Sequence, residues 1–164
     1  MQEDILINWS PQETRVAIVE SGVTLGALNA AAAALGLSAG IDLGARASCT
    51  IGGMIATNAG GMEAFRNGSM RSRVLGLEAV MADGSVFDDL ITVLKSNIGY
   101  DIKQLIIGSE GTLGIVTKAV IRLEPIHTRT ATFLISFDSA KAAIQALRRI
   151  VGEADVKVLR SEIM

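Results

Sequence analysis

The chain has 164 residues, enough for one domain with a hydrophobic core or for one and a half small domains. Its 15 Lys and Arg residues are scattered among 17 Asp and Glu residues with a net charge of −2, so a nucleic-acid-binding surface is not expected. The hydrophobic fraction of 49% and the mean hydropathy of +0.42 are high for a free-standing soluble domain. One explanation is apolar surface that something outside this chain covers.

A single cysteine, Cys49, and a single histidine, His127, limit the chemistry of the chain. These counts exclude an intrachain disulfide and argue against a Cys/His zinc site, so no metal is predicted. Cys49 is interpreted as a small buried apolar residue, and the predicted location is cytoplasmic. The acidic start, MQEDILINW, lacks the basic region of a secretory signal. The uncharged run at 21–41 has four glycines and mostly alanine as its apolar content, which favours a soluble helix over a transmembrane segment.

The first predicted elements are two β-strands, at residues 4–8 and 15–19, separated by the turn-forming sequence SPQET. A helix over about 24–35 follows, with Thr24 as its N-cap and Gly36 at its end. The helix-compatible sequence MIATNA predicts a second, short helix.

A β-hairpin is predicted over residues 74–89, because the Asp83-Gly84 pair is a strong hairpin-turn signal. Residues 94–111 are predicted as a loop leading into a short helix. Residues 112–125 form a β-rich run that Pro125 ends.

The predicted pattern of secondary structure changes after residue 128. Residues 130–137 (TATFLISF) are predicted as a strand, residues 139–154 as a helix capped by Ser139, and residues 156–164 as the beginning of another strand. This β-α-β pattern predicts two domains, at 1–125 and 126–164, of which the second is incomplete.

The stretch at 48–61, SCTIGGMIATNAGG, has four glycines and no charged side chain. Successive backbone N–H groups can form a concave anion site, and glycine lets the anion approach. The alternative, a tightly packed crossing of small residues, is equally compatible with the local sequence. The chain contains neither GxGxxG nor GxxxxGK[ST]. A second cluster at 108–117, GSEGTLGIVT, suggests that two glycine-rich loops could hold two parts of one long ligand, such as a dinucleotide.

Three blocks of sequence carry a family resemblance: DLGARASCTIGGMIATNAGG, NGSMRSRVLGLEAVMADGSVFDD and NIGYDIKQLIIGSEGTLGIVTKAVIRLEP. In their order and spacing they resemble the PCMH-type FAD-binding domain of FAD-linked oxidases in the vanillyl-alcohol oxidase superfamily. The similarity is strongest to the branch of D-2-hydroxyglutarate dehydrogenase, D-lactate dehydrogenase and the glycolate oxidase flavoprotein subunit. It implies an α+β fold, namely the second subdomain of that domain, with a mainly antiparallel sheet flanked by helices, followed by the start of an α/β cap domain.

The resemblance also implies that FAD is the cofactor and lies against backbone amides. By motif match, the flavin and phosphates would contact Leu43, Gly44, Ala45, Ser48, Gly52, Gly53, Ala56, Thr57, Asn58, Gly60 and Gly61. The phosphates, ribose or adenine would contact Glu110, Gly114, Ile115 and Val116. Two departures from the family pattern, Met54 after GG and Asn67 before Gly68, alter the expected surroundings of the flavin.

The implied activity is FAD-dependent oxidation of the CH–OH group of a D-2-hydroxy acid such as D-2-hydroxyglutarate, D-lactate or glycolate. No catalytic residue is assigned, and His127 is interpreted as a linker residue. Arg71 and Arg73 are interpreted as contacts to a phosphate or to the substrate carboxylate or, more commonly, as partners in surface or interdomain salt bridges. The resemblance covers only part of the family's FAD domain and cap, so the chain is expected to be a fragment. The alternatives are a non-catalytic remnant or interaction module that keeps the fold, and a portion restored by a complementing chain or by homo-oligomerisation.

Overall fold

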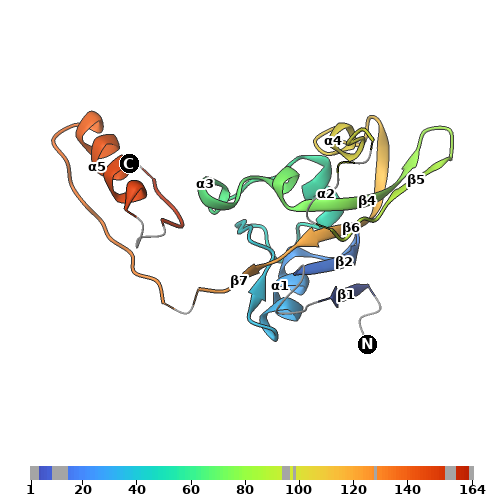
Figure 1. Cartoon of the computed structure of the whole chain (residues 1–164), viewed down its shortest axis with the longest axis horizontal. Helices are drawn as coiled ribbons and strands as arrows, with labels where there is room; N and C mark the ends of the chain where they lie inside the picture. The colour runs from blue at the N-terminus through green and yellow to red at the C-terminus, as the bar shows by residue number, and fades with distance from the viewer. Residues whose placement is uncertain are drawn as a thin grey trace. The chain divides into compact units, whose positions relative to one another are not determined.

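The computed structural model describes residues 4–8, 15–93, 97, 99–127, 129–153 and 158–162 (Figure 1). The predicted SPQET turn lies outside these residues. The chain divides into two compact units, Met1–Ile126 and His127–Met164.

The first unit is built on a five-stranded sheet in which every neighbouring pair is antiparallel. The strand order is β1-β2-β6-β4-β5 (Figure 1). The strands are β1 (Ile5–Asn8), β2 (Val16–Glu20), β4 (Val74–Met81), β5 (Val86–Asp89) and β6 (Gly114–Arg122). The α+β fold class with a mainly antiparallel sheet, predicted from the sequence, is confirmed.

Short helices connect and cover these strands. They are α1 (Leu25–Ala33), α2 (Ile51–Ala56), α3 (Ala64–Asn67), the 3₁₀ helix η1 (Met70–Ser72) and α4 (Lys103–Ile106). A second sheet pairs β3 (Leu37–Ser38) with β7 (Glu124–Pro125). The core joins α1, α2 and the large sheet through side chains that are less than 2% exposed, among them Leu28, Ile55 and Leu77.

Local capping and turn signals are realised as predicted. The hydroxyl of Thr24 accepts a hydrogen bond from Ala27 N at 3.2 Å, and α1 ends slightly earlier than expected. The β4–β5 hairpin turns at Asp83, whose carboxylate accepts from the backbone and hydroxyl of Ser85. The uncharged run at 21–41 is divided between α1 and β3. Within the described ranges, no helix is long and apolar enough to cross a membrane.

The second unit contains α5 (Ala140–Gly152), which begins at the predicted cap: Ser139 Oγ accepts from Ala142 N at 3.2 Å. The predicted strand at 130–137 is wrong. Phe133 and Leu134 are 79% and 87% exposed, and no described segment pairs with them. A single strand without a hydrogen-bonded neighbour is not stable in water, which explains the difference. Residues 158–162 of the last predicted strand also have no strand structure.

Candidate functional site

The first glycine-rich segment, residues 48–61, contains α2 and the loop that follows it. Thr50 is the N-cap of α2, and its hydroxyl accepts from Gly53 N at 3.2 Å. At the other end, the hydroxyl of Thr57 donates to Gly53 O at 2.9 Å. Ala56 lies between these residues on the same side of the helix, because positions three and four apart share a face. This outward face therefore carries only small side chains.

The fold itself requires glycine at two of the predicted cofactor positions. Gly52 N donates to Ser21 O at 2.8 Å, and a Cβ atom at Gly52 would lie 2.6 Å from the Cβ atom of Ser21. Gly61 has φ +83°, and a Cβ atom there would collide with the carbonyl oxygen of Asp42. Packing and backbone conformation account for both glycines, whatever else they contact.

Packing does not account for Gly44. No heavy atom lies within 4 Å of the position that its Cβ atom would occupy, and its φ is outside the left-handed region. At Gly53, an added Cβ atom would meet the capping hydroxyl of Thr50 at 3.1 Å. Both residues are exposed. A glycine that the chain does not need for its own packing fits a ligand that approaches the backbone.

The backbone N–H groups at the start of α2 donate to acceptors within the chain, whereas the sequence suggested that they would bind an anion. Ile51 N donates to Val23 O at 2.8 Å, Gly52 N donates to Ser21 O, and Gly53 N is held by Thr50. These N–H groups are not available to an anion.

Unpaired amides lie instead on two neighbouring loops. Within the described part of the chain, the backbone N–H groups of Gly44, Ala45, Gly60 and Gly61 have no hydrogen-bond partner. A hydrogen bond of 3.0 Å from Met62 N to Asp42 O holds the two loops side by side. Two pairs of neutral donors are thus placed close together, an arrangement that suits a phosphate group.

The second glycine-rich segment, residues 108–117, lies directly on the C-terminal end of α2. Gly108 N donates to Ile55 O at 3.0 Å, and Glu110 N donates to Ala56 O at 2.9 Å. Glu110 has φ +53°, an uncommon value for a residue with a side chain, and its carboxylate is exposed. The structure therefore brings together the two segments that the sequence suggested would hold one ligand.

The remaining predicted cofactor residues differ in exposure. In β6, Ile115 is 63% exposed, whereas Gly114 is buried and the side chain of Val116 faces the interior. Leu43 is half-buried, and the exposed Ser48 donates its hydroxyl to Ala45 O at 3.2 Å.

The two arginines considered as phosphate contacts bind groups within the chain. Arg71 donates to the backbone carbonyls of Gln104 and Ile107. Arg73 is 3% exposed and forms an ion pair of 2.7 Å with Glu124. Burial lowers the pKa of Arg73, and the attraction of Glu124 opposes this shift without cancelling it. Arg73 therefore forms a salt bridge, but a buried one within the first unit rather than the surface or interdomain one that the sequence favoured.

One residue that sequence reasoning missed is Thr50. Its hydroxyl fixes the N-terminal turn of α2 and thereby the exposed backbone at Gly53. The available signal was a threonine four positions before Met54, the first residue of the sequence MIATNA, because threonine is a favoured N-cap residue.

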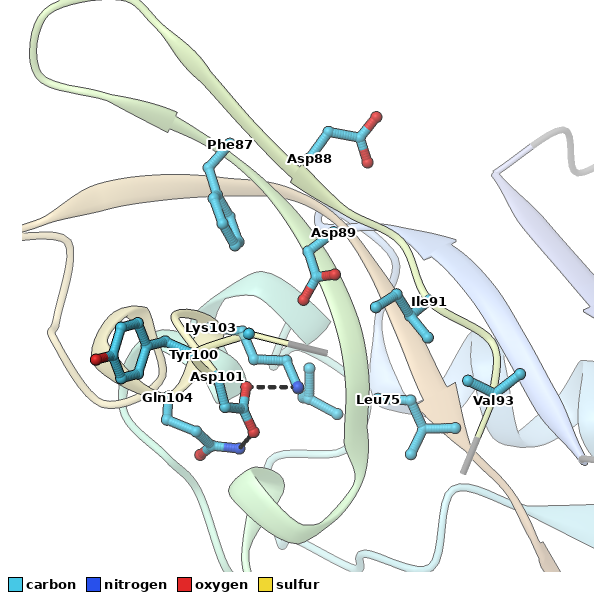
Figure 2. A pocket seen from close by; sticks show the side chains of 12 residues that line it. Leu75, Phe87, Asp88, Asp89, Ile91, Val93, Tyr100, Asp101, Lys103 and Gln104 are labelled. Atoms are coloured by element: carbon cyan, nitrogen blue, oxygen red, sulfur yellow. Dashed lines mark hydrogen bonds and ion pairs between the residues drawn. The ribbon is translucent and has the colours of Figure 1, made fainter. Parts of the chain in front are cut away.

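A pocket of about 350 Å³ lies elsewhere, between the β4–β5 hairpin and α4 (Figure 2). Its polar lining includes Asp89, Gln104 and the ion pair between Lys103 and Asp101, in which Nζ and Oδ1 are 2.6 Å apart. None of the predicted cofactor residues lines this pocket, so the pocket is not at the predicted cofactor site. We place the candidate site at the glycine-rich segments and the adjoining loop at residues 44–45, because the unpaired amides lie on that loop and at the end of the first segment. Among the described residues, no cluster of His, Cys, Asp and Glu could hold a metal ion.

Comparison with known proteins bears on the cofactor. The FAD binding domain family matches residues 5–89. A probable D-2-hydroxyglutarate dehydrogenase of Oryza sativa subsp. indica is 48% identical over 89 residues, or 52% of this chain and 16% of that protein. The D-2-hydroxyglutarate dehydrogenase of Danio rerio is 49% identical over 90 residues, or 52% of this chain and 17% of that protein. The glycolate oxidase subunit GlcD of Bacillus subtilis is 39% identical over 85 residues, or 52% of this chain and 18% of that protein.

Solved structures share the fold. A structure of alkyldihydroxyacetonephosphate synthase has a TM-score of 0.67 and 24% sequence identity, covering 92% of this chain and 27% of that one. The chain thus matches less than a fifth of each of the three relatives named above. The family match extends over half of the chain and includes the whole first glycine-rich segment. The chain therefore belongs to the FAD binding domain family, and its cofactor is FAD.

Proposed function

We propose that this chain is the FAD-binding portion of a dehydrogenase that oxidises the CH–OH group of a D-2-hydroxy acid. The substrate class is supported by the names of similar proteins, which include D-2-hydroxyglutarate dehydrogenases, a putative D-lactate dehydrogenase and a glycolate oxidase subunit. The observation that carries the proposal is the pair of neighbouring loops with unpaired amides, beside a helix face that has only small side chains.

The proposed cofactor site has a polar and a flat part. The unpaired amides of Gly44, Ala45, Gly60 and Gly61 would bind the pyrophosphate, because neutral N–H donors on adjacent loops match its several oxygens. The outward face of α2 would accept a flat group, since no long side chain stands on it.

When bound, FAD supplies the oxidising group, which accepts the hydride from Cα while a base takes the hydroxyl proton and a 2-oxo acid forms. The contribution of this chain is orientation: the backbone donors fix the cofactor without a side chain that must be ordered on binding. We assign no catalytic base to the chain. His127 is exposed and belongs to the second unit, which we propose to be the start of a substrate-binding cap.

Location and assembly remain part of the proposal. The cytoplasmic location predicted from the sequence stays a prediction, and several similar proteins carry the word mitochondrial in their names. A complementing chain or a homo-oligomer would supply any groups needed for turnover.

The test is a titration of the purified chain with FAD, followed by flavin fluorescence and thermal shift. Gly44→Asp places a carboxylate at the unpaired amides, and Gly22→Asp is the matched control. Gly22 is exposed, and its added Cβ atom would also meet nothing within 4 Å. We expect saturable binding by the wild type that Gly44→Asp abolishes and Gly22→Asp retains. A folded chain that does not bind FAD would refute the proposal and favour a non-catalytic module.

The substrate is tested on the FAD-loaded chain. D-2-hydroxyglutarate, D-lactate and glycolate are added without oxygen, and loss of visible flavin absorbance is recorded. We expect negligible reduction by the purified chain alone, and reduction by one of the three acids once a polypeptide carrying the cap is added. No reduction by any of them in the presence of the cap would refute the substrate class.

A further inference from the structure

Arg71 is half-buried and makes four hydrogen bonds within the chain, two of them from its guanidinium to backbone carbonyls. Its Nη1 donates to the backbone carbonyl of Gln104 at 2.7 Å and to the side-chain oxygen of Gln104 at 2.8 Å, and its Nη2 donates to the carbonyl of Ile107. Its own backbone N–H donates to Asn58 Oδ1 at 2.9 Å. Arg71 is thus bonded to two other segments of the chain, the loop after α2 and the helix α4 with its C-cap.

These bonds join the end of the first glycine-rich segment to the start of the second. Asn58 follows α2 and has φ +49°, a conformation that its bond with Arg71 helps to hold. Ile107 directly precedes Gly108. A Cβ atom at Gly108 would lie 3.3 Å from Asn58 Cβ and 3.4 Å from Arg71 Nη2, so the two segments meet closely at the guanidinium.

The guanidinium also satisfies carbonyls at the C-terminal end of α4, which a four-residue helix leaves without internal partners. A positive charge at that end is favourable, and the planar fork of arginine can bond several oxygens in one fixed geometry. Lysine carries its three N–H donors on one nitrogen, so it cannot place donors at both the Nη1 and Nη2 positions at once.

We propose that Arg71 is a positioning residue for FAD: it holds the two glycine-rich segments in the relative placement that the cofactor requires, without contacting the cofactor. This inference rests on the proposed site at these segments. It departs from the sequence interpretation of Arg71 as a phosphate contact, because all the bonds described for its guanidinium are to the protein.

The experiment compares Arg71→Met and Arg71→Lys with the control Arg148→Met, which removes the same charge from an exposed position in the second unit. The first measurement is amide hydrogen exchange without FAD. Gly108 N and Glu110 N are the reporters, because their bonds to the end of α2 depend on the placement of the second segment. We expect faster exchange at both amides in the two Arg71 variants and no change in the control.

The second measurement is FAD affinity well below the melting temperature of each variant. We expect FAD affinity to fall by about tenfold in both Arg71 variants. This is the lower end of the loss of metal affinity seen when a residue that orients a metal ligand is removed. A role confined to overall stability would leave the affinity of the folded fraction unchanged.

The outcomes distinguish failure of the positioning role of Arg71 from failure of the proposed FAD-binding function. Unchanged exchange rates of the Gly108 and Glu110 amides in Arg71→Met overturn the inference that Arg71 joins the two segments, whatever the FAD affinity. Faster exchange with unchanged affinity overturns the positioning role. A folded wild type that does not bind FAD overturns the proposed function, and the positioning role with it, while the exchange data still decide whether Arg71 joins the segments.

Discussion

Substitution by alanine should have different effects at Gly44 and Gly61, two glycines on neighbouring loops. Gly61 has φ +83°, and a Cβ atom there would collide with the carbonyl oxygen of Asp42 and lie 2.9 Å from Leu43 Cδ2. Gly44 has an ordinary φ and open space around its missing side chain. We therefore expect alanine at Gly61 to affect folding and alanine at Gly44 to affect the cofactor.

The magnitudes follow from these contacts. Placing alanine in the left-handed conformation at Gly61 costs roughly 1–2 kcal/mol. Moving the Asp42 backbone away from the new methyl group adds about 1–3 kcal/mol, as other overpacked positions do. The free energy of unfolding of Gly61→Ala should therefore fall by about 3 kcal/mol. Gly44→Ala should change it by less than about 1 kcal/mol, with a small gain from the reduced freedom of the unfolded chain.

The assay pairs urea denaturation of the protein without cofactor with FAD titration of the folded variants. We expect Gly44→Ala to lower FAD affinity by about tenfold, since a methyl group would separate the ligand from the unpaired amides. Gly22→Ala, at an equally open position in the turn before α1, should change the free energy of unfolding as little as Gly44→Ala and leave FAD affinity unchanged. The reasoning fails if Gly44→Ala unfolds as readily as Gly61→Ala, or if it binds FAD like the wild type.

Two further predictions concern charged groups. Glu124→Gln leaves the buried Arg73 without its ion-pair partner, so the free energy of unfolding should fall by about 3 kcal/mol in urea denaturation. Glu20→Gln, at an exposed pair, should cost less than about 0.5 kcal/mol, and equal losses would contradict this. Partial burial raises the pKa of Asp101, but the hydrogen bond and charge of Lys103 contribute to a net lowering below the usual 3.8. Its contribution to stability is thus present above pH 3.8 and lost as the pH falls through the folded pKa; Lys103→Met should raise that pKa in a carboxyl NMR titration, and an unchanged value would count against the ion pair.

The sequence predicted features whose causes lie close together along the chain. Thr24 and Ser139 accept hydrogen bonds from the third residue after them, and the Asp83-Gly84 turn closes a hairpin between adjacent strands. The strand at 130–137 failed for the opposite reason, because β structure depends on a partner that local pattern does not contain. The family blocks gave the fold class, since their order and spacing encode the contacts between distant segments.

The candidate site shows where such reasoning stops. All the glycines of the first segment look equivalent in the sequence, yet Gly52 is required by Ser21 and Gly61 by Asp42, both from earlier parts of the chain. In the same way, Arg71 reads as a cation near a phosphate loop, whereas its guanidinium bonds carbonyls more than thirty positions later. Distinguishing a glycine or arginine needed by the fold from one needed by a ligand requires the distances.

Because Arg71 and Arg73 both bind groups within the chain, they affect how this domain can bind an anionic cofactor. Arg73 pairs with Glu124, and Arg71 is bonded to main-chain carbonyls, so the bonds described for both guanidinium groups are to the protein. The unpaired donors described at Gly44, Ala45, Gly60 and Gly61 are neutral N–H dipoles. Attraction between dipoles and an anion falls off faster with distance than attraction between charges, and it depends on the direction of each N–H group. At the proposed site we therefore expect FAD binding to depend strongly on the relative placement of the loops. For this reason we expect the residues that set this placement to matter as much as the glycines at the cofactor.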